Sequence, residues 1–151
     1  MENTNDKYIG KILDDRYEII ELIGSGGMAN VYKALCHRLN RYDAVKIMRD
    51  ETAANTELRR RFRAESQAVA MLSHPNIVSV YDVSHNDDVE YIVMELIDGI
   101  TLKQYLQKKS VLDPAEVLDF TIQTAKALEQ DRKSTRLNSS HKVQSRMPSS
   151  A

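Results

Sequence analysis

The chain has 151 residues, of which 42% are hydrophobic and 28% are charged, so it has the composition of one globular domain or part of one. Because 21 Lys and Arg residues are balanced by 22 Asp and Glu residues, the net charge gives no general attraction to nucleic acid or to an anionic membrane. A single cysteine, a polar start and the lack of any run of about 18 apolar residues argue against an internal disulfide, a secretory signal and a membrane span, so we expect a cytoplasmic chain.

Three β-rich segments come first and are predicted to be strands: Tyr17–Ile23, Asn30–Ala34 and Asp43–Met48. An amphipathic helix follows them, because apolar residues recur with the helical period at Leu58, Phe62, Val69 and Leu72. Pro75 ends this helix, since proline restricts the residue before it and cannot continue the hydrogen-bond pattern.

Two further strands, Ile77–Val83 and Val89–Leu96, are predicted on either side of a polar turn. Leu102–Gln107 suits a short helix, and Asp113 followed by Pro114 is typical of the N-cap and first position of a longer one. Five strands and one helix therefore precede the remaining helices. This order predicts an α+β fold with a five-stranded antiparallel sheet rather than alternating strands and helices.

A glycine-rich loop, Gly24–Ala29, joins the first two predicted strands. Glycines let a backbone approach phosphate oxygens closely, although the same residues also fit a tight hairpin turn. A dinucleotide-binding loop requires a helix directly after the glycines, whereas Asn30–Ala34 is strand-like here. A strand on each side of the glycines is the arrangement that covers ATP in protein kinases.

Lys46 and Glu65 are charged residues at positions where apolar neighbours prevail. Lys46 lies within an apolar strand, and Glu65 lies in line with the apolar residues of its helix. Each could be a partly exposed surface charge. Because an unpaired buried charge is costly, however, an ion pair between the two would remove both penalties, and we predict that they face each other.

In these features the sequence resembles eukaryotic-type protein kinases, and in particular the membrane-anchored serine/threonine kinases of Gram-positive bacteria that carry extracellular PASTA repeats. The resemblance extends from about Ile9 to Gln130. It rests on six motifs in order: Arg16–Ile19, Gly24–Tyr32, Ala44–Lys46, Arg61–Glu65, His74–Val78 and Tyr91–Glu95.

The resemblance implies a kinase small lobe, with a five-stranded antiparallel sheet and its αC helix, followed by the first helices of a truncated large lobe. The phosphates of ATP would lie under the loop formed by Gly24, Ser25, Gly26, Gly27, Met28 and Ala29. Lys46 would hold the α- and β-phosphates and pair with Glu65. One departure is Ala29, where the general kinase pattern has a third glycine.

The same resemblance assigns the adenine pocket. Ile23, Val31 and Ala44 would enclose the base, and Met94 would be the gatekeeper residue. The backbones of Glu95 and Ile97 would bond to the edge of the base, with Asp98 near the ribose.

The motifs of the large lobe are missing from the sequence. Soon after Gln130 the family has a His-Arg-Asp motif, whose aspartate positions the substrate hydroxyl, and later an Asp-Phe-Gly motif that binds magnesium; neither motif is in this chain. Asp131–His141 and Ser145–Ala151 instead match one reading frame of a common sequencing-library adapter, with the variable index of the adapter between them. We therefore predict a polar lead at 1–8, a small lobe at 9–97, the start of a large lobe at 98–130 and a disordered, non-native tail at 131–151.

The function predicted for the parent protein is phosphoryl transfer from ATP to protein Ser or Thr, with Mg²⁺ as the metal and no metal ligand in this chain. The alternative for the literal chain is an inert module that binds nucleotide or dimerises through its small lobe. A dinucleotide-dependent redox enzyme is disfavoured by the strand that follows the glycines.

Overall fold

The computed structural model describes the backbone of residues 6–85 and 89–144 and the side chains of residues 6–84 and 89–133. Contacts between residues divide the described chain into two compact units. The first contains the residues up to Ala70 together with Ser79–Ile97, and the second contains Met71–Val78 together with the residues from Asp98 onward. One division falls after Ile97, and Met71–Val78 groups with the second unit.

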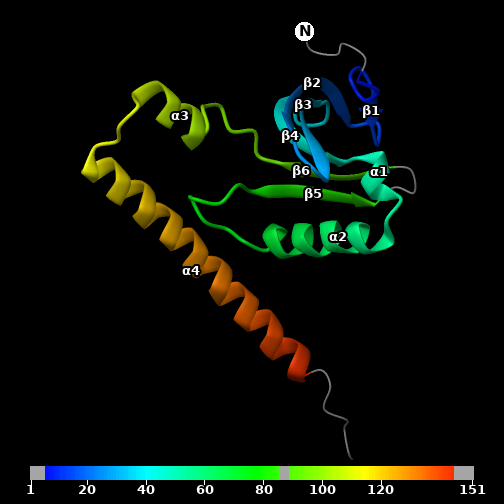
Figure 1. Cartoon of the computed structure of the whole chain (residues 1–151). Helices are drawn as coiled ribbons and strands as arrows, with labels where there is room; N and C mark the ends of the chain where they lie inside the picture. Colours follow the sequence, from blue (N-terminus) through cyan, green and yellow to red (C-terminus); the bar gives the residue numbers. More distant parts are fainter. Residues whose placement is uncertain (1–5, 86–88, 145–151) are drawn as a thin grey trace, which may run out of the picture. The chain divides into compact units, whose positions relative to one another are not determined.

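The first unit is built on a curled sheet in which every pair of neighbouring strands is antiparallel (Figure 1). The strand order is β1-β2-β3-β4-β6-β5. The strands are β1 (Ile12–Leu13), β2 (Tyr17–Ser25), β3 (Ala29–Cys36), β4 (Arg41–Met48), β5 (Val80–His85) and β6 (Glu90–Met94). The five predicted strands and the α+β class are confirmed, with bounds that differ by up to three residues.

The sixth strand, β1, was not predicted. It forms a tight hairpin with β2, in which the Arg16 amide donates to the Leu13 carbonyl at 3.0 Å. The two residues of this turn, Asp14 and Asp15, both have positive φ, at 49° and 51°. Aspartate tolerates this left-handed conformation better than most residues do, so the pair can replace the more usual Asn-Gly turn.

Both faces of the sheet are covered, because the strands alternate between two clusters of buried side chains. The larger cluster contains four tyrosines and aliphatic residues of β2, β3, β4 and β6, including Val45 and Ile47. The smaller cluster contains Phe62 from α2 (Thr56–Ala70) together with Ala29, Met48 and Ile92. The helix α2 runs beside β5 in Figure 1 and covers this second face.

A one-turn helix, α1 (Asp50–Ala53), connects β4 to α2. The predicted helix is confirmed as α2, and its buried residues are Phe62 and Ser66. Asn55 caps its start, since its side-chain oxygen accepts from the amides of Glu57 at 3.0 Å and Leu58 at 3.2 Å.

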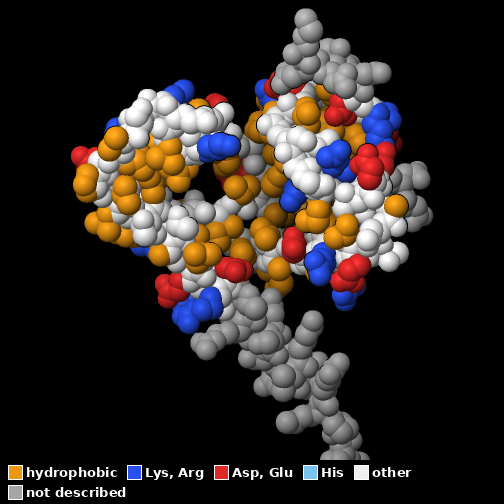
Figure 2. All heavy atoms as spheres, viewed as in Figure 1, with side chains coloured by type: hydrophobic (Ala, Val, Ile, Leu, Met, Phe, Trp, Pro, Cys, Tyr) orange, Lys and Arg blue, Asp and Glu red, His pale blue; other side chains and the backbone are white. Residues whose placement is uncertain are grey.

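The second unit contains α3 (Leu102–Lys109) and α4 (Pro114–Gln144). The predicted cap at Asp113 is confirmed, because its Oδ1 accepts from the Ala115 amide at 2.8 Å and α4 begins at Pro114. Within this unit a cavity of about 520 Å³ is lined mainly by side chains of α3 and α4, including Tyr105 and Phe120. Figure 2 shows apolar side chains gathered on the surface of this unit.

The prediction of disorder from residue 131 onward differs from the structure, in which α4 continues to Gln144. A helix extends more easily than it nucleates, since each added residue gains one hydrogen bond after the first turn has formed. An ion pair of 2.8 Å between Lys133 and Glu129, one turn apart, supports the helix just beyond Gln130. Residues 145–151 of the predicted tail lie outside the described residues.

In the portion of the chain that is described, none of the helices combines the length and apolar character needed to cross a membrane.

Candidate functional site

The glycine loop forms a tight turn between β2 and β3. The Gly26 amide donates to the Ala29 carbonyl at 2.9 Å and closes the turn. A Cβ on Gly26 would lie 3.2 Å from that carbonyl oxygen, which is closer than almost any side chain tolerates. On Gly27 a Cβ would meet nothing within 4 Å, so the backbone of the turn is open to an incoming group at this point.

The register of the sheet brings the predicted site residues into one row. Gly24 pairs with Val31, and Val31 pairs with Lys46 on the next strand. Two residues before Lys46 on β4, Ala44 pairs with Met94 of β6. Directly paired residues point to the same side of a sheet, so Val31, Ala44, Lys46 and Met94 share one face.

Lys46 reaches a cavity of about 150 Å³ on this face, which is also lined by Glu65, Ser66 and Val69 of α2. The Lys46 ammonium lies 5.7 Å from the centre of the Phe62 ring, where the electron-rich face of the ring attracts a cation. The structure thus places Lys46 and Glu65 at the same cavity.

Glu65 is exposed to solvent, and no ion pair joins it to Lys46 in the described part of the chain. The buried side of α2 runs through Phe62 and Ser66, which leaves Glu65 at the edge of the buried stripe. The expectation that Glu65 is buried on the inner face is therefore corrected, whereas its pairing with Lys46 stays a prediction.

The segment after β6 is fixed by two bonds to Ser79. The Glu95 amide donates to the Ser79 carbonyl at 2.9 Å, and the Ser79 amide donates to the Glu95 carboxylate at 3.3 Å. With its amide engaged, Glu95 has only its backbone carbonyl to offer to a base. Ile97 is 60% exposed, and Ile23 and Met28 are also exposed, so these predicted contacts lie at the surface of the first unit.

A charged cluster that was not predicted fixes α2 against the sheet. Glu90 of β6 is 3% exposed, and its carboxylate accepts from Arg59 at 2.9 Å and from Arg63 Nε at 2.9 Å. Hydrogen bonds from Arg63 and Arg59 lower the pKa of Glu90 to about 2, although burial alone would raise it. The sequence signal that could have indicated this cluster is Glu90 itself, a carboxylate at the start of an otherwise apolar strand.

Comparison with known proteins identifies the family. The pattern described as "Protein kinase domain" matches residues 17–130, which is most of the chain. The chain belongs to the protein kinase family. The matched region of this kinase ends at Gln130, the residue after which the sequence predicts the family pattern to break.

Curated relatives of this chain are bacterial serine/threonine kinases. It is 50% identical over 126 residues to "Probable serine/threonine-protein kinase CPE1738" of Clostridium perfringens, covering 83% of this chain and 18% of that protein. It is 48% identical over 120 residues to "Serine/threonine-protein kinase PrkC" of Bacillus subtilis, covering 80% of this chain and 18% of that protein. The chain thus spans about a fifth of the length of these relatives.

Solved structures agree on the fold. The PknI kinase domain of Mycobacterium tuberculosis superimposes with a TM-score of 0.70 and 30% sequence identity, over 82% of this chain and 50% of that one. The first unit therefore has the fold of a kinase small lobe, and the second corresponds to part of a large lobe. Membership in the family implies, in general, the use of ATP, a divalent metal and protein substrates.

The described residues contain no group of three or more His, Cys, Asp or Glu side chains that could hold a metal ion. The residues at the glycine turn and the cavity suit a nucleotide, because the open backbone at Gly27 and the cation of Lys46 both fit phosphate groups.

Proposed function

We propose that this chain is the ATP-binding part of a protein serine/threonine kinase. The observation that carries the proposal is the row Gly24, Val31 and Lys46, which joins the glycine turn to a cavity-facing lysine through direct strand pairing. A lysine at this place offers a fixed positive charge to phosphate oxygens that the glycine turn covers from above.

The adenine would lie on the same face of the sheet. Val31, Ala44 and Met94 supply apolar contacts there, and Ile23 would cover the base from the edge of the turn. The engaged amide of Glu95 supports a role for its carbonyl as an acceptor from the base, with the amide of Ile97 as the donor. These assignments follow the kinase family residue by residue.

The pairing of Lys46 with Glu65 belongs to the same proposal. Both side chains line one cavity, and this shared lining supports the proposed pair. Phosphates bound to Lys46 would favour this arrangement, because Glu65 would then hold the lysine in place from the other side.

For the parent protein we propose phosphoryl transfer to protein Ser or Thr, and for the literal chain an inert module that binds nucleotide. The end of the family match at Gln130 supports a boundary there, followed by a translated adapter sequence. Resequencing the gene beyond the Gln130 codon tests this hypothesis. Genomic DNA that encodes residues 131–151 would contradict it. From the family resemblance alone, we propose that the parent protein also has PASTA repeats and a membrane anchor with a cytoplasmic kinase domain. On the same ground we propose that it forms a homodimer through its small lobe.

The test is ATP binding by calorimetry with Lys46→Met and Lys108→Met compared. Lys108 is the control, since it is an exposed residue of α3 in the second unit and does not line the cavity. We expect Lys46→Met to weaken ATP binding about tenfold or more, because a charge-assisted bond contributes about 1.5–3 kcal/mol. Equal affinities for the two variants would contradict the proposed site.

A further inference from the structure

The residues before the first strand pack onto the sheet. Tyr8, which the sequence places in a polar lead, is 7% exposed and meets Tyr32 of β3 edge to face with ring centres 6.0 Å apart. Backbone bonds reinforce the contact, since the Gly10 amide donates to the Ile19 carbonyl at 2.8 Å and the Ile19 amide donates to the Lys11 carbonyl at 2.9 Å. The lead is thus bound to β2 and β3.

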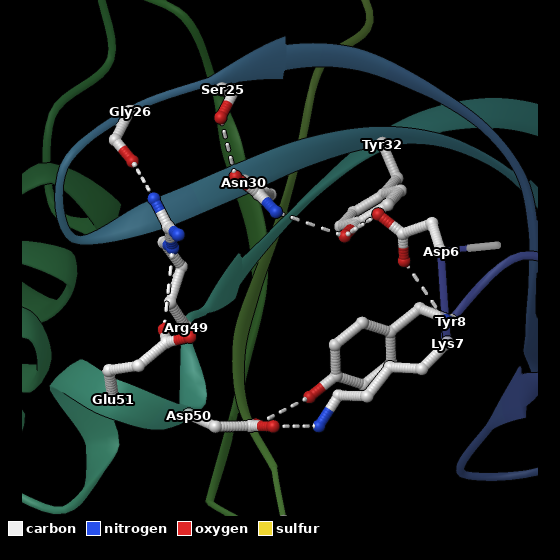
Figure 3. A network of polar contacts seen from close by, with 10 residues as sticks. All are labelled: Asp6, Lys7, Tyr8, Ser25, Gly26, Asn30, Tyr32, Arg49, Asp50 and Glu51. Carbon is white, nitrogen blue, oxygen red and sulfur yellow. Dashed lines mark hydrogen bonds and ion pairs between the residues drawn. The ribbon is translucent and has the colours of Figure 1, made fainter. Parts of the chain in front are cut away.

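Side-chain hydrogen bonds connect this lead to the glycine turn (Figure 3). The Tyr32 hydroxyl donates to Asp6 at 2.8 Å and accepts from the Asn30 side-chain amide at 3.3 Å. The Ser25 hydroxyl then donates to the Asn30 side-chain oxygen at 2.9 Å. Ser25 is the last residue of β2, so the chain of bonds ends where the turn begins.

A second connection runs through the start of α1. Asp50 forms an ion pair with Lys7 and accepts from the Tyr8 hydroxyl at 3.3 Å. The neighbouring Arg49 amide donates to the Met28 carbonyl at 3.0 Å, on the far side of the turn. Figure 3 shows the contacts of Tyr32 with Asp6 and of Asp50 with Lys7 and Tyr8 meeting at the lead. The two ends of the glycine turn are therefore tied to one segment.

We propose that Asp6, Tyr32 and Asn30 are positioning residues that hold the glycine turn where it covers the phosphates of ATP. The inference rests on the proposed function for its ligand. Tyr32 lies in the larger buried cluster, whereas the cavity at Lys46 is lined by residues of the smaller one, so these side chains act through Ser25. Asp6 also precedes the region matched to the kinase family, which begins at residue 17.

The physical reason is conformational entropy. A glycine-rich turn loses more freedom on ordering than other segments do, and that loss opposes binding. Bonds that restrict the turn before the nucleotide arrives reduce this cost. A carboxylate that accepts from a phenol gives a stronger bond than two neutral groups would, and bonds in series strengthen one another.

The first experiment measures amide hydrogen exchange in the full chain without nucleotide, comparing Tyr32→Phe with Tyr17→Phe. Both tyrosines are 1% exposed and both donate to an aspartate, but the partner of Tyr17 is Asp82, at 3.2 Å. We expect exchange at the Gly26 and Arg49 amides to rise about three- to tenfold in Tyr32→Phe only, which is the loss of about one hydrogen bond. No rise, or an equal rise in both variants, would overturn the proposal.

The second experiment compares the affinities of ATP and adenosine in the same variants. Tyr32→Phe is expected to weaken ATP binding about threefold or more and to leave adenosine binding unchanged, because only ATP carries the phosphates that the turn covers. Equal weakening of both ligands would overturn the positioning role. If the unchanged chain binds neither ligand, the proposed function fails while hydrogen exchange still decides whether the lead holds the turn.

A double-mutant cycle shows whether the effect passes through the lead. Asp6→Asn keeps a side-chain oxygen for the Tyr8 amide, which donates to Asp6 at 3.1 Å, and removes the charge that strengthens the bond to Tyr32. Alone it should raise exchange at the Gly26 amide, but it should add little in the Tyr32→Phe background, where that bond is already lost. Additive effects of the two substitutions would show that Asp6 and Tyr32 act separately and would contradict the proposed chain of bonds.

Discussion

Glu90 shows how one buried charge depends on its partners. Its side chain is 2% exposed, while Arg59 and Arg63 are 32% and 41% exposed. The carboxylate therefore gives up nearly all of its hydration, and two guanidinium groups that still contact water replace it. Such a cluster stabilises the fold only while the carboxylate is ionised.

The stability of the first unit should therefore depend on pH through Glu90. The pKa of Glu90 falls from its ordinary value of 4.5 to about 2 on folding, so its contribution is fully present above pH 4.5 and is lost as the pH falls towards 2. At 1.36 kcal/mol per pKa unit the contribution is about 3 kcal/mol near neutral pH. We expect Glu90→Gln to lower the free energy of unfolding by about this amount at pH 7.

Denaturant unfolding of both proteins across this pH range gives the measurement. The difference between them should shrink as the pH falls from 4.5 towards 2. Glu57→Gln is the control, because Glu57 is exposed on the same helix that carries both arginines and pairs with Arg60 at 2.9 Å. It should leave the free energy of unfolding almost unchanged. A constant difference between Glu90→Gln and the unchanged chain would exclude the carboxylate as the titrating group.

The helix α3 begins at a capping motif formed by its own sequence. Thr101 and Gln104 form a reciprocal cap at the start of α3, in which the Gln104 amide donates to the Thr101 hydroxyl at 3.2 Å and the Thr101 amide donates to the Gln104 side chain at 2.8 Å. None of the residues of α3 is buried, so packing gives this helix little support. Its order depends on the cap.

Removing the cap should loosen α3. Thr101→Ala is expected to destabilise the helix by about 1 kcal/mol, whereas Thr101→Ser keeps the hydroxyl and should retain most of the stability. Hydrogen exchange at the Tyr105 amide, which donates to the Thr101 carbonyl at 2.9 Å, reports the change. If Ala and Ser substitutions gave the same exchange rate, the hydroxyl would have no capping role.

The strands and the row of site residues could be predicted because period-two alternation and turn residues are local signals. Ala44 and Lys46 were assigned to one face from alternation alone, and the pairing with Met94 confirms that face. The hairpin at Asp14 was missed because aspartates are a weaker turn signal than Asn-Gly. The expected burial of Glu65 was wrong. The helical period shows which residues lie in line with the apolar side chains of α2, but it does not show which of them the sheet covers.

The polar partners of Glu90 and Tyr32 could not be predicted. Arg59 and Glu90 are 31 residues apart, and Tyr32 and Asp6 are 26 apart. Each charge has several possible partners of opposite sign in the sequence. Only the folded sheet decides which of them meet, so these contacts required the structure.

For the whole molecule, the surface of α4 is the feature with the widest effect. Its described part exposes Val117, Leu118, Ile122 and Leu128, at 47%, 61%, 42% and 64%. In an intact kinase, by the proposal above, a large lobe would cover them. Exposed apolar surface of this kind favours association between molecules.

Self-association should therefore fall when this surface is made polar. We expect the double substitution Leu118→Lys and Leu128→Lys to shift the chain towards monomer in sedimentation velocity at equal concentration. Lys108→Leu with Lys126→Leu is the opposite control and should increase association. A chain that is already monomeric before substitution would contradict the expected association.

Cys36 lies in β3 with no exposed surface, and it is the only thiol in the chain. It packs in the larger buried cluster, between strands that hold the glycine turn. A thiol reagent in water can reach its sulfur only when β2 or β4 separates from β3. The rate at which a thiol reagent labels this cysteine therefore measures how often the sheet opens, and no cysteine has to be introduced for the measurement.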